Sequence, residues 1–193
     1  MVKTRNTNAI KGRLSILVVL TVLLLLVQIV NSFTNYSLNS WGGIYPRHTS
    51  GLIGIIVAPF LHGSWSHLFS NLLPLLILSV LAMINSVQEY LKASLFIMIM
   101  GGILVWLFGR SALHVGASGW IFGLWAWLLL RAIFQHNLTN LLIATGVFIL
   151  YGGLWLGFLP KTGVSFEGHI AGAFSGVFFA YISRNQRIKK TTL

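Results

Sequence analysis

The sequence has 193 residues, of which 56% are hydrophobic and only 8% are charged. Because a soluble domain carries about 25% charged residues, this composition excludes an ordinary soluble protein and fits roughly six membrane-spanning helices of about 20 residues each. The formal charge of +11 comes from lysines and arginines that lie between apolar runs and form no single basic face, which argues against nucleic-acid binding. Cysteine and aspartate are absent, so thiol chemistry is excluded, and the two acids are Glu89 and Glu167.

Six apolar segments predict an all-α membrane protein. The first, residues 14–30, follows the basic residues 1–13 and is too long for the apolar region of a signal peptide. A long connection, residues 31–66, contains the short apolar stretch 52–61, which we expect to be interfacial or re-entrant because Gly54 and Pro59 interrupt it. The other helices are expected at residues 66–84, 93–108, 116–134, 141–158 and 168–182. Glu89 and Lys92 mark the expected loop between the second and third helices.

The basic residues predict the orientation of these helices. With the N-terminus inside, the outer connections hold only Arg47, Arg110 and Lys161. The inner segments hold ten basic residues: Lys3, Arg5, Lys11, Arg13, Lys92, Arg131, Arg184, Arg187, Lys189 and Lys190. We therefore expect cytoplasmic tails at 1–13 and 184–193, a six-helix domain at 14–183, and the second, fourth and sixth helices starting at the outer face.

Strongly polar side chains at membrane depth are candidates for function. Ser118 lies at the start of the fourth helix and His169 at the start of the sixth, and either alone fits a packing role. Gly172 and Gly176 follow His169 at a spacing that permits close helix contact. If that face meets Gly119 and Gly123, His169 comes within hydrogen-bond distance of Ser118 and can act as its general base.

A Ser-His dyad is the simplest arrangement of these groups. Phe122 lies one turn after Ser118, where its ring could pack against the imidazole of His169. Without aspartate a Ser-His-Asp triad is impossible. Glu167 is only two residues from His169 and is expected to point elsewhere on the helix.

Acyl transfer also needs donors for the developing oxyanion. His67 and Asn71 are four residues apart on one helix face, and the backbone N–H of Ser118 is a third candidate donor. His62 falls before this helix and is expected to brace the loop. The loop residues His48, His114 and His136 are not expected to take part in catalysis.

The combined motifs resemble the rhomboid family of intramembrane serine proteases over residues 14–182. They are Gly116-Ala117-Ser118-Gly119, His62 with His67 and Asn71, and His169 with Gly172 and Gly176. The resemblance implies a six-transmembrane-helix rhomboid-like bundle with a membrane-dipping first loop, Ser118 as nucleophile, His169 as base, and His67, Asn71 and the Ser118 amide as the oxyanion hole. It also implies a structural role for Glu89. Many members carry a Trp-Arg pair in the first loop, whereas Trp41 and Arg47 are separated here.

The expected activity is a serine endopeptidase that cuts transmembrane protein substrates in the lipid bilayer of a cell membrane, without metal or cofactor. One alternative is a catalytically silent rhomboid-like protein that binds membrane helices. Another is a transporter or channel that uses His62, His67 and His169 as a proton or metal path, although no internal repeat supports it. The absence of an H-E-x-x-H motif and of aspartate argues against zinc and two-aspartate proteases.

Overall fold

The computed structural model describes residues 2–185, with side chains from residue 10 onward. The predicted tail residues Arg187, Lys189 and Lys190 lie outside this part, as do the side chains of Lys3 and Arg5. The described chain is helical and contains no β-strand, only one isolated bridge between Ile44 and His114. Its α-helices are α1 (Val2–Phe33), α2 (Ser37–Gly42), α3 (Gly54–Val57), α4 (Trp65–Met83), α5 (Val87–Phe108), α6 (Ser118–Gln135), α7 (Leu138–Tyr151) and α8 (Phe166–Ile182). Short 3₁₀ helices are η1 (Thr49–Gly51), η2 (Ala58–Phe60) and η3 (Gly152–Phe158).

Within the part of the chain that the structure describes, four helical segments are long and apolar enough to cross a membrane. They are Ile10–Phe33 within α1, α4, α5, and the segment Leu138–Phe158 formed by α7 and η3. The helices α6 and α8 have 18 and 17 residues and are not among them. The structure therefore supports an all-helical membrane protein, whereas the six-span arrangement stays a prediction.

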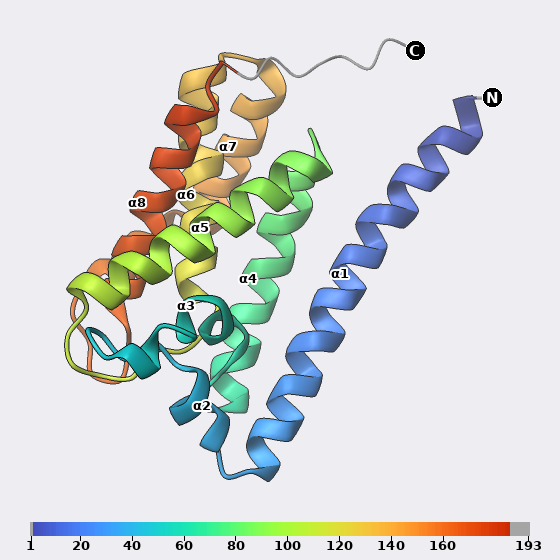
Figure 1. Cartoon of the computed structure of the whole chain (residues 1–193). Helices are drawn as coiled ribbons and strands as arrows, with labels where there is room; N and C mark the ends of the chain where they lie inside the picture. The colour runs from blue at the N-terminus through green and yellow to red at the C-terminus, as the bar shows by residue number, and fades with distance from the viewer. Residues whose placement is uncertain (1, 186–193) are drawn as a thin grey trace.

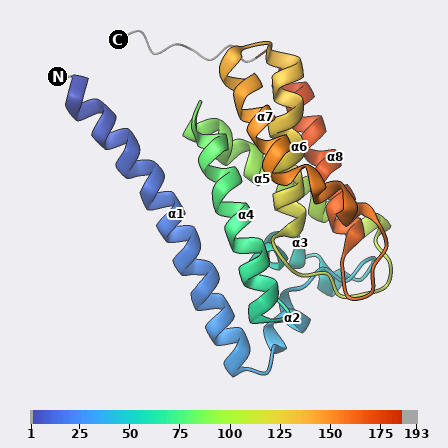
Figure 2. The same cartoon turned by 180° about the vertical axis from the view of Figure 1, so that it is seen from behind.

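Helix α6 lies at the centre of the bundle and packs against α4, α5, α7 and α8, while α1 lies along α4 on the outside (Figures 1 and 2). The core around α6 includes Leu124 and Trp127, which are fully buried. On the side facing α8, a Cβ atom on Gly172 or Gly176 would overlap the backbone of Gly119 or Gly123. The predicted close contact between these glycine pairs is confirmed, and it joins the helices that carry Ser118 and His169.

The predicted loop at Glu89 and Lys92 is wrong. Helix α5 begins at Val87 because Ser86 caps it: the Ser86 hydroxyl accepts a hydrogen bond of 3.2 Å from the Glu89 backbone N–H. Ser86 and Glu89 have the spacing of a capping box, a helix-start pattern. Both Glu89 and Lys92 therefore belong to the first turns of α5.

The fifth predicted helix also differs in its second half. Helix α7 ends at Tyr151, and the chain continues as the tighter 3₁₀ helix η3 from Gly152. Two successive glycines, Gly152 and Gly153, weaken regular helix at this point. This change matters because η3 presents a backbone carbonyl to the candidate site described below.

The first loop folds as a series of short helices rather than a spanning segment. The stretch predicted to be interfacial or re-entrant contains α3, which packs against α5, and η2, which packs against α6 (Figure 1). Arg47 fastens the loop to the end of α5: its guanidinium donates to the Gly109 carbonyl at 2.7 Å and to the Ser111 hydroxyl at 3.1 Å. Although Trp41 and Arg47 are separated and form no Trp-Arg pair, Arg47 still anchors the loop. Trp41 is exposed.

Candidate active site

Ser118 is the first residue of α6, and the turn before it requires glycine. Gly116 has a φ of +117°, which side-chain-bearing residues rarely adopt. The Gly116 N–H donates to the Ala58 carbonyl at 2.9 Å, and the Ala117 N–H donates to Nε2 of His62 at 3.4 Å. The N–H groups of the two residues before Ser118 are therefore hydrogen-bonded. The N–H of Ser118 itself belongs to the first turn of α6, where backbone donors have no partner within the helix.

His169 is held in the first turn of α8 by two contacts. Its Nδ1 lies 2.7 Å from the Gly157 carbonyl oxygen, so Nδ1 carries the proton and donates it to that oxygen. Nε2 is then the unprotonated, accepting nitrogen. The ring stacks on Phe122, with 4.1 Å between ring centroids and 2° between planes. The predicted packing of Phe122 against the imidazole is confirmed.

His67 and Asn71 lie one turn apart at the start of α4. Ser64 caps this helix by accepting the His67 N–H at 3.0 Å, and the Asn71 amide donates to the His67 carbonyl at 3.1 Å. The His67 ring lies directly against Gly116, where a Cβ would come within 2.8 Å of Cε1 and Nε2. Both side chains therefore reach the turn that leads into Ser118.

These residues meet in one cavity. A space of about 1050 Å³ is lined by Ser118, His169, His67, Asn71 and Phe122, together with residues of the loops before α6 and α8. Three helices thus bring the predicted nucleophile, base and oxyanion donors to a common space. Ser118 Oγ makes no hydrogen bond to His169 in this structure; catalytic hydrogen bonds are often long before substrate binds.

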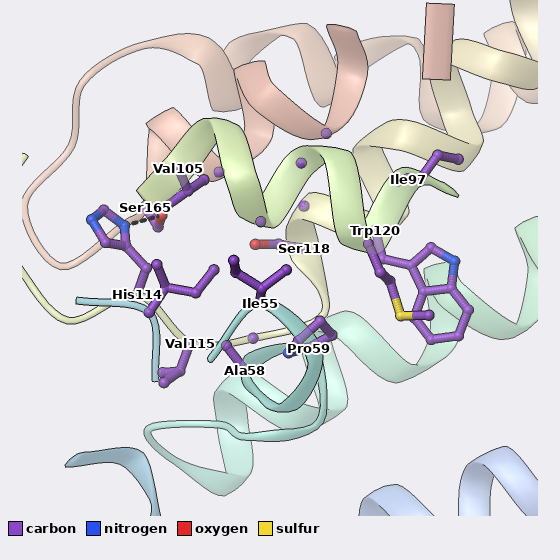
Figure 3. Close-up of a pocket in the computed structure, with 18 residues that line it drawn as sticks. Ile55, Ala58, Pro59, Ile97, Val105, His114, Val115, Ser118, Trp120 and Ser165 are labelled. Atoms are coloured by element: carbon purple, nitrogen blue, oxygen red, sulfur yellow. Dashed lines mark hydrogen bonds between the residues drawn. The ribbon is translucent and has the colours of Figure 1, made fainter. Parts of the chain in front are cut away.

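A smaller cavity of about 50 Å³ lies on the other side of Ser118 (Figure 3). In that view Ser118 lies between Ile55 of the first loop and the ribbon of α5. Two adjacent glycines of α5, Gly101 and Gly102, line this cavity and keep it open. A Cβ on Gly102 would press against Ile55. Ser118 therefore lines both cavities.

His62 lies behind the site rather than in it. Its ring is fully buried, meets the His67 ring edge to face with centroids 5.0 Å apart, and does not line the larger cavity. Burial, with the neighbouring His67 adding to it, lowers the pKa of His62 to about 4. The ring is therefore neutral near pH 7, which leaves Nε2 able to accept the Ala117 N–H.

Glu167 and His114 make contacts of their own, although His114 also lines both cavities. Glu167 pairs with Arg110 at 3.4 Å, and His114 binds the Ser165 hydroxyl at 2.6 Å, the dashed line in Figure 3. These contacts join the loop before α6 to the start of α8. His48 and His136 do not line the cavity.

Glu89 lies in α5, near its start, and forms a buried ion pair with Arg131 of α6. Arg131, which was counted among the basic residues of the inner segments, is 1% exposed and therefore lies buried inside the bundle. Each of these ions is partnered, as a charge removed from water must be. The pair ties α5 to α6.

Sequence reasoning missed two contributors to the site. The Gly157 carbonyl takes the place that a carboxylate has in a triad, but a backbone acceptor leaves no signal in the sequence. Ser64 could have been found as the cap of α4 from its position three residues before His67.

Comparison with known proteins found a family match and several relatives. Residues 49–186 match the rhomboid domain. An uncharacterized protein of Mycobacterium tuberculosis is 38% identical over 170 residues, covering 83% of this chain and 70% of that protein. An uncharacterized protein of Mycobacterium leprae is 37% identical over 170 residues, covering 83% and 67%. RHOMBOID-like protein 4 of Arabidopsis thaliana is 33% identical over 129 residues, covering 64% and 32%. Since the matched domain spans well over half of the chain and includes Ser118, His169, His67 and Asn71, the protein belongs to the rhomboid family.

Proposed function

We propose that the protein is an intramembrane serine endopeptidase that hydrolyses peptide bonds in or near transmembrane segments of membrane proteins. The observation that carries the proposal is the shared cavity of Ser118, His169, His67 and Asn71. The orientation of His169 supports it, because the bond from Nδ1 to the Gly157 carbonyl leaves Nε2 free to take a proton.

In the proposed reaction, Nε2 of His169 takes the hydroxyl proton of Ser118 as Oγ attacks the scissile carbonyl carbon. The carbonyl oxygen becomes an oxyanion and accepts hydrogen bonds from the Ser118 backbone N–H and the side chains of His67 and Asn71. His169 then gives its proton to the leaving amine, and the C–N bond breaks to leave an ester on Ser118. Water attacks that ester, with its proton passing to His169, and the return of this proton to Oγ releases the acid.

The proposal includes an arrangement in the cell membrane. The six segments predicted from the sequence would span it as one domain, residues 14–183, with both termini in the cytoplasm and the cavity opening toward the outer face. The starts of α4, α6 and α8 lie at one end of the bundle, which supports a single opening (Figure 1). A substrate helix must unwind locally to expose its carbonyl, because helical backbone groups are bonded to one another in lipid. Gly or Pro in the substrate eases that step.

The test is cleavage of a single-span substrate in liposomes by purified protein. Ser118→Ala and His169→Ala are expected to abolish cleavage, and Ser118→Ala to abolish labelling by a fluorophosphonate probe. Ser94→Ala, a buried serine of α5 outside both cavities, and His136→Ala, at the far end of α6, are matched controls that should cleave normally. Full cleavage by Ser118→Ala would overturn the proposal. A wild-type protein that neither cleaves nor reacts with the probe would favour the catalytically silent helix-binding protein instead.

A further inference from the structure

A chain of hydrogen bonds links the end of α1 to the turn that carries Ser118. It begins at two buried asparagines, Asn31 of α1 and Asn39 of α2, which are 0% and 8% exposed. The Asn31 amide donates to the Asn39 side-chain oxygen at 2.8 Å and to the His62 carbonyl at 3.1 Å, and the Asn39 amide lies 3.4 Å from the same carbonyl. Figures 1 and 2 both show α2 and the end of α1 beside the start of α4.

The chain continues through the side chain of His62. Its Nε2 accepts the N–H of Ala117, the residue before Ser118, and its ring packs on the ring of His67. One residue therefore contacts both the turn that positions the nucleophile and a candidate oxyanion donor. Among the described residues, the hydrogen bonds recorded to the His62 carbonyl come from Asn31 and Asn39.

We propose that Asn31 and Asn39 are positioning residues, which act through His62 to hold Ser118 and His67 in the geometry that acylation requires. This inference rests on the proposed protease function. Both asparagines precede the residues 49–186 that match the rhomboid domain, so the proposal gives the α1–α2 connection a part in the site.

Simple packing does not explain this cluster. A buried amide is costly unless it is hydrogen-bonded, and an apolar side chain of the same size would fill the space without that cost. Gln28, one turn earlier on the same helix, provides the contrast: it is fully buried, yet neither of its amide atoms has a partner in the described structure. Gln28 is therefore the matched control for a buried α1 amide that does not reach the site.

The experiment measures the second-order rate constant for fluorophosphonate labelling of Ser118, per folded molecule, beside the thermal unfolding midpoint. Asn31→Leu is expected to slow labelling tenfold to about a hundredfold, because a displacement of about 1 Å at a reacting atom costs up to about 10²-fold. Asn39→Leu is expected to slow it less, since the bond from Asn31 to the His62 carbonyl survives. Gln28→Leu should label at the wild-type rate. A merely structural role would lower the unfolding midpoint but leave the rate per folded molecule unchanged.

Variants of His62 test whether the asparagines act through it. His62→Leu removes the acceptor for Ala117 and should slow labelling, whereas His62→Gln offers Oε1 near the position of Nε2 and should restore it. The double variant Asn31→Leu with His62→Leu should be no slower than His62→Leu alone, because residues of one network are not additive. Wild-type labelling by both asparagine variants, or effects that multiply in the double variant, would overturn the inference.

Amide exchange at Ala117 gives a readout that does not depend on activity. Asn31→Leu should speed hydrogen exchange of the Ala117 N–H, and Gln28→Leu should leave it unchanged. If wild-type protein fails to react with the probe, the proposed function fails, and exchange at Ala117 still decides whether Asn31 holds this turn. If Asn31→Leu does not fold, the same two measurements on Asn39→Leu decide the question.

Discussion

The contact between α6 and α8 allows a quantitative prediction at Gly172. A Cβ atom there would overlap the Gly119 carbonyl oxygen and come within 2.7 Å of its carbonyl carbon. Because the obstacle is backbone and cannot rotate away, Gly172→Ala should cost about 3 kcal/mol, the upper end for overpacking. Alanine returns about 1 kcal/mol through its better helix propensity, so the net loss in unfolding free energy is about 2 kcal/mol.

Gly146 of α7 is the matched control, because a Cβ there meets no atom within 4 Å. Gly146→Ala should gain about 1 kcal/mol, so the two variants should differ by about 3 kcal/mol in equilibrium unfolding in mixed micelles. The rate of fluorophosphonate labelling should also differ between Gly172→Ala and Gly146→Ala. Gly119 follows Ser118 and Gly172 is one turn from His169, so parting the helices by about 1 Å should slow fluorophosphonate labelling about 10²-fold. Equal stability and equal labelling in the two alanine variants would refute the reasoning.

Three further predictions concern groups around the cavity. His67→Ala and Asn71→Ala should each lower kcat by about 10²-fold to 10³-fold with little change in KM, as expected for an oxyanion donor; a change confined to KM in steady-state cleavage would argue against that role. Phe122→Leu removes the ring stacked on His169 and should slow cleavage about twofold to tenfold, since such stacking contributes about 0.5–1.5 kcal/mol; an unchanged rate would argue against a role for the stacked ring. The third concerns pH: since the pKa of His62 is lowered to about 4 in the folded protein, the unfolded chain binds more protons between about pH 4 and its ordinary pKa of 6.5. The contribution of neutral His62 to the free energy of unfolding is at most about 3 kcal/mol. It is complete above about pH 6.5 and is lost as pH falls toward 4. Unfolding measured across this range should show the slope in wild type and a shallower slope in His62→Gln.

The sequence predicted the parts of the site that depend on helical spacing. The interval of four residues from His67 to Asn71 brings both to the turn at Gly116, and the same interval from Ser118 to Phe122 brings that ring onto His169. The glycines after His169 predicted the contact with α6. Each of these inferences needs only the helix period and the size of a side chain.

What the sequence did not predict depends on tertiary context. Arg131 was counted among the exposed basic residues of the inner segments, because hydropathy cannot distinguish an exposed cation from one paired with Glu89 in the bundle. Glu89 was assigned to a loop for its charge, although Ser86 three residues before it is a helix-start signal. The partners of Asn31 and Asn39 lie on other elements, so no local pattern indicates them.

The way His169 is held suits the proposed reaction inside a membrane. A carboxylate beside the histidine would fix its tautomer and stabilise the imidazolium formed during the reaction, but it would add a permanent charge that is costly at membrane depth. The Gly157 carbonyl fixes the tautomer without a charge, and it is available because η3 follows α7 at this point of the chain. A neutral carbonyl stabilises the imidazolium less than a carboxylate does. The face of Phe122 offsets part of that difference, since an aromatic ring attracts a cation placed over it by about 0.5–2 kcal/mol. In the proposed protease, a backbone acceptor and an aromatic face would thus divide between them the two tasks of a triad carboxylate, and neither adds a permanent charge to the site.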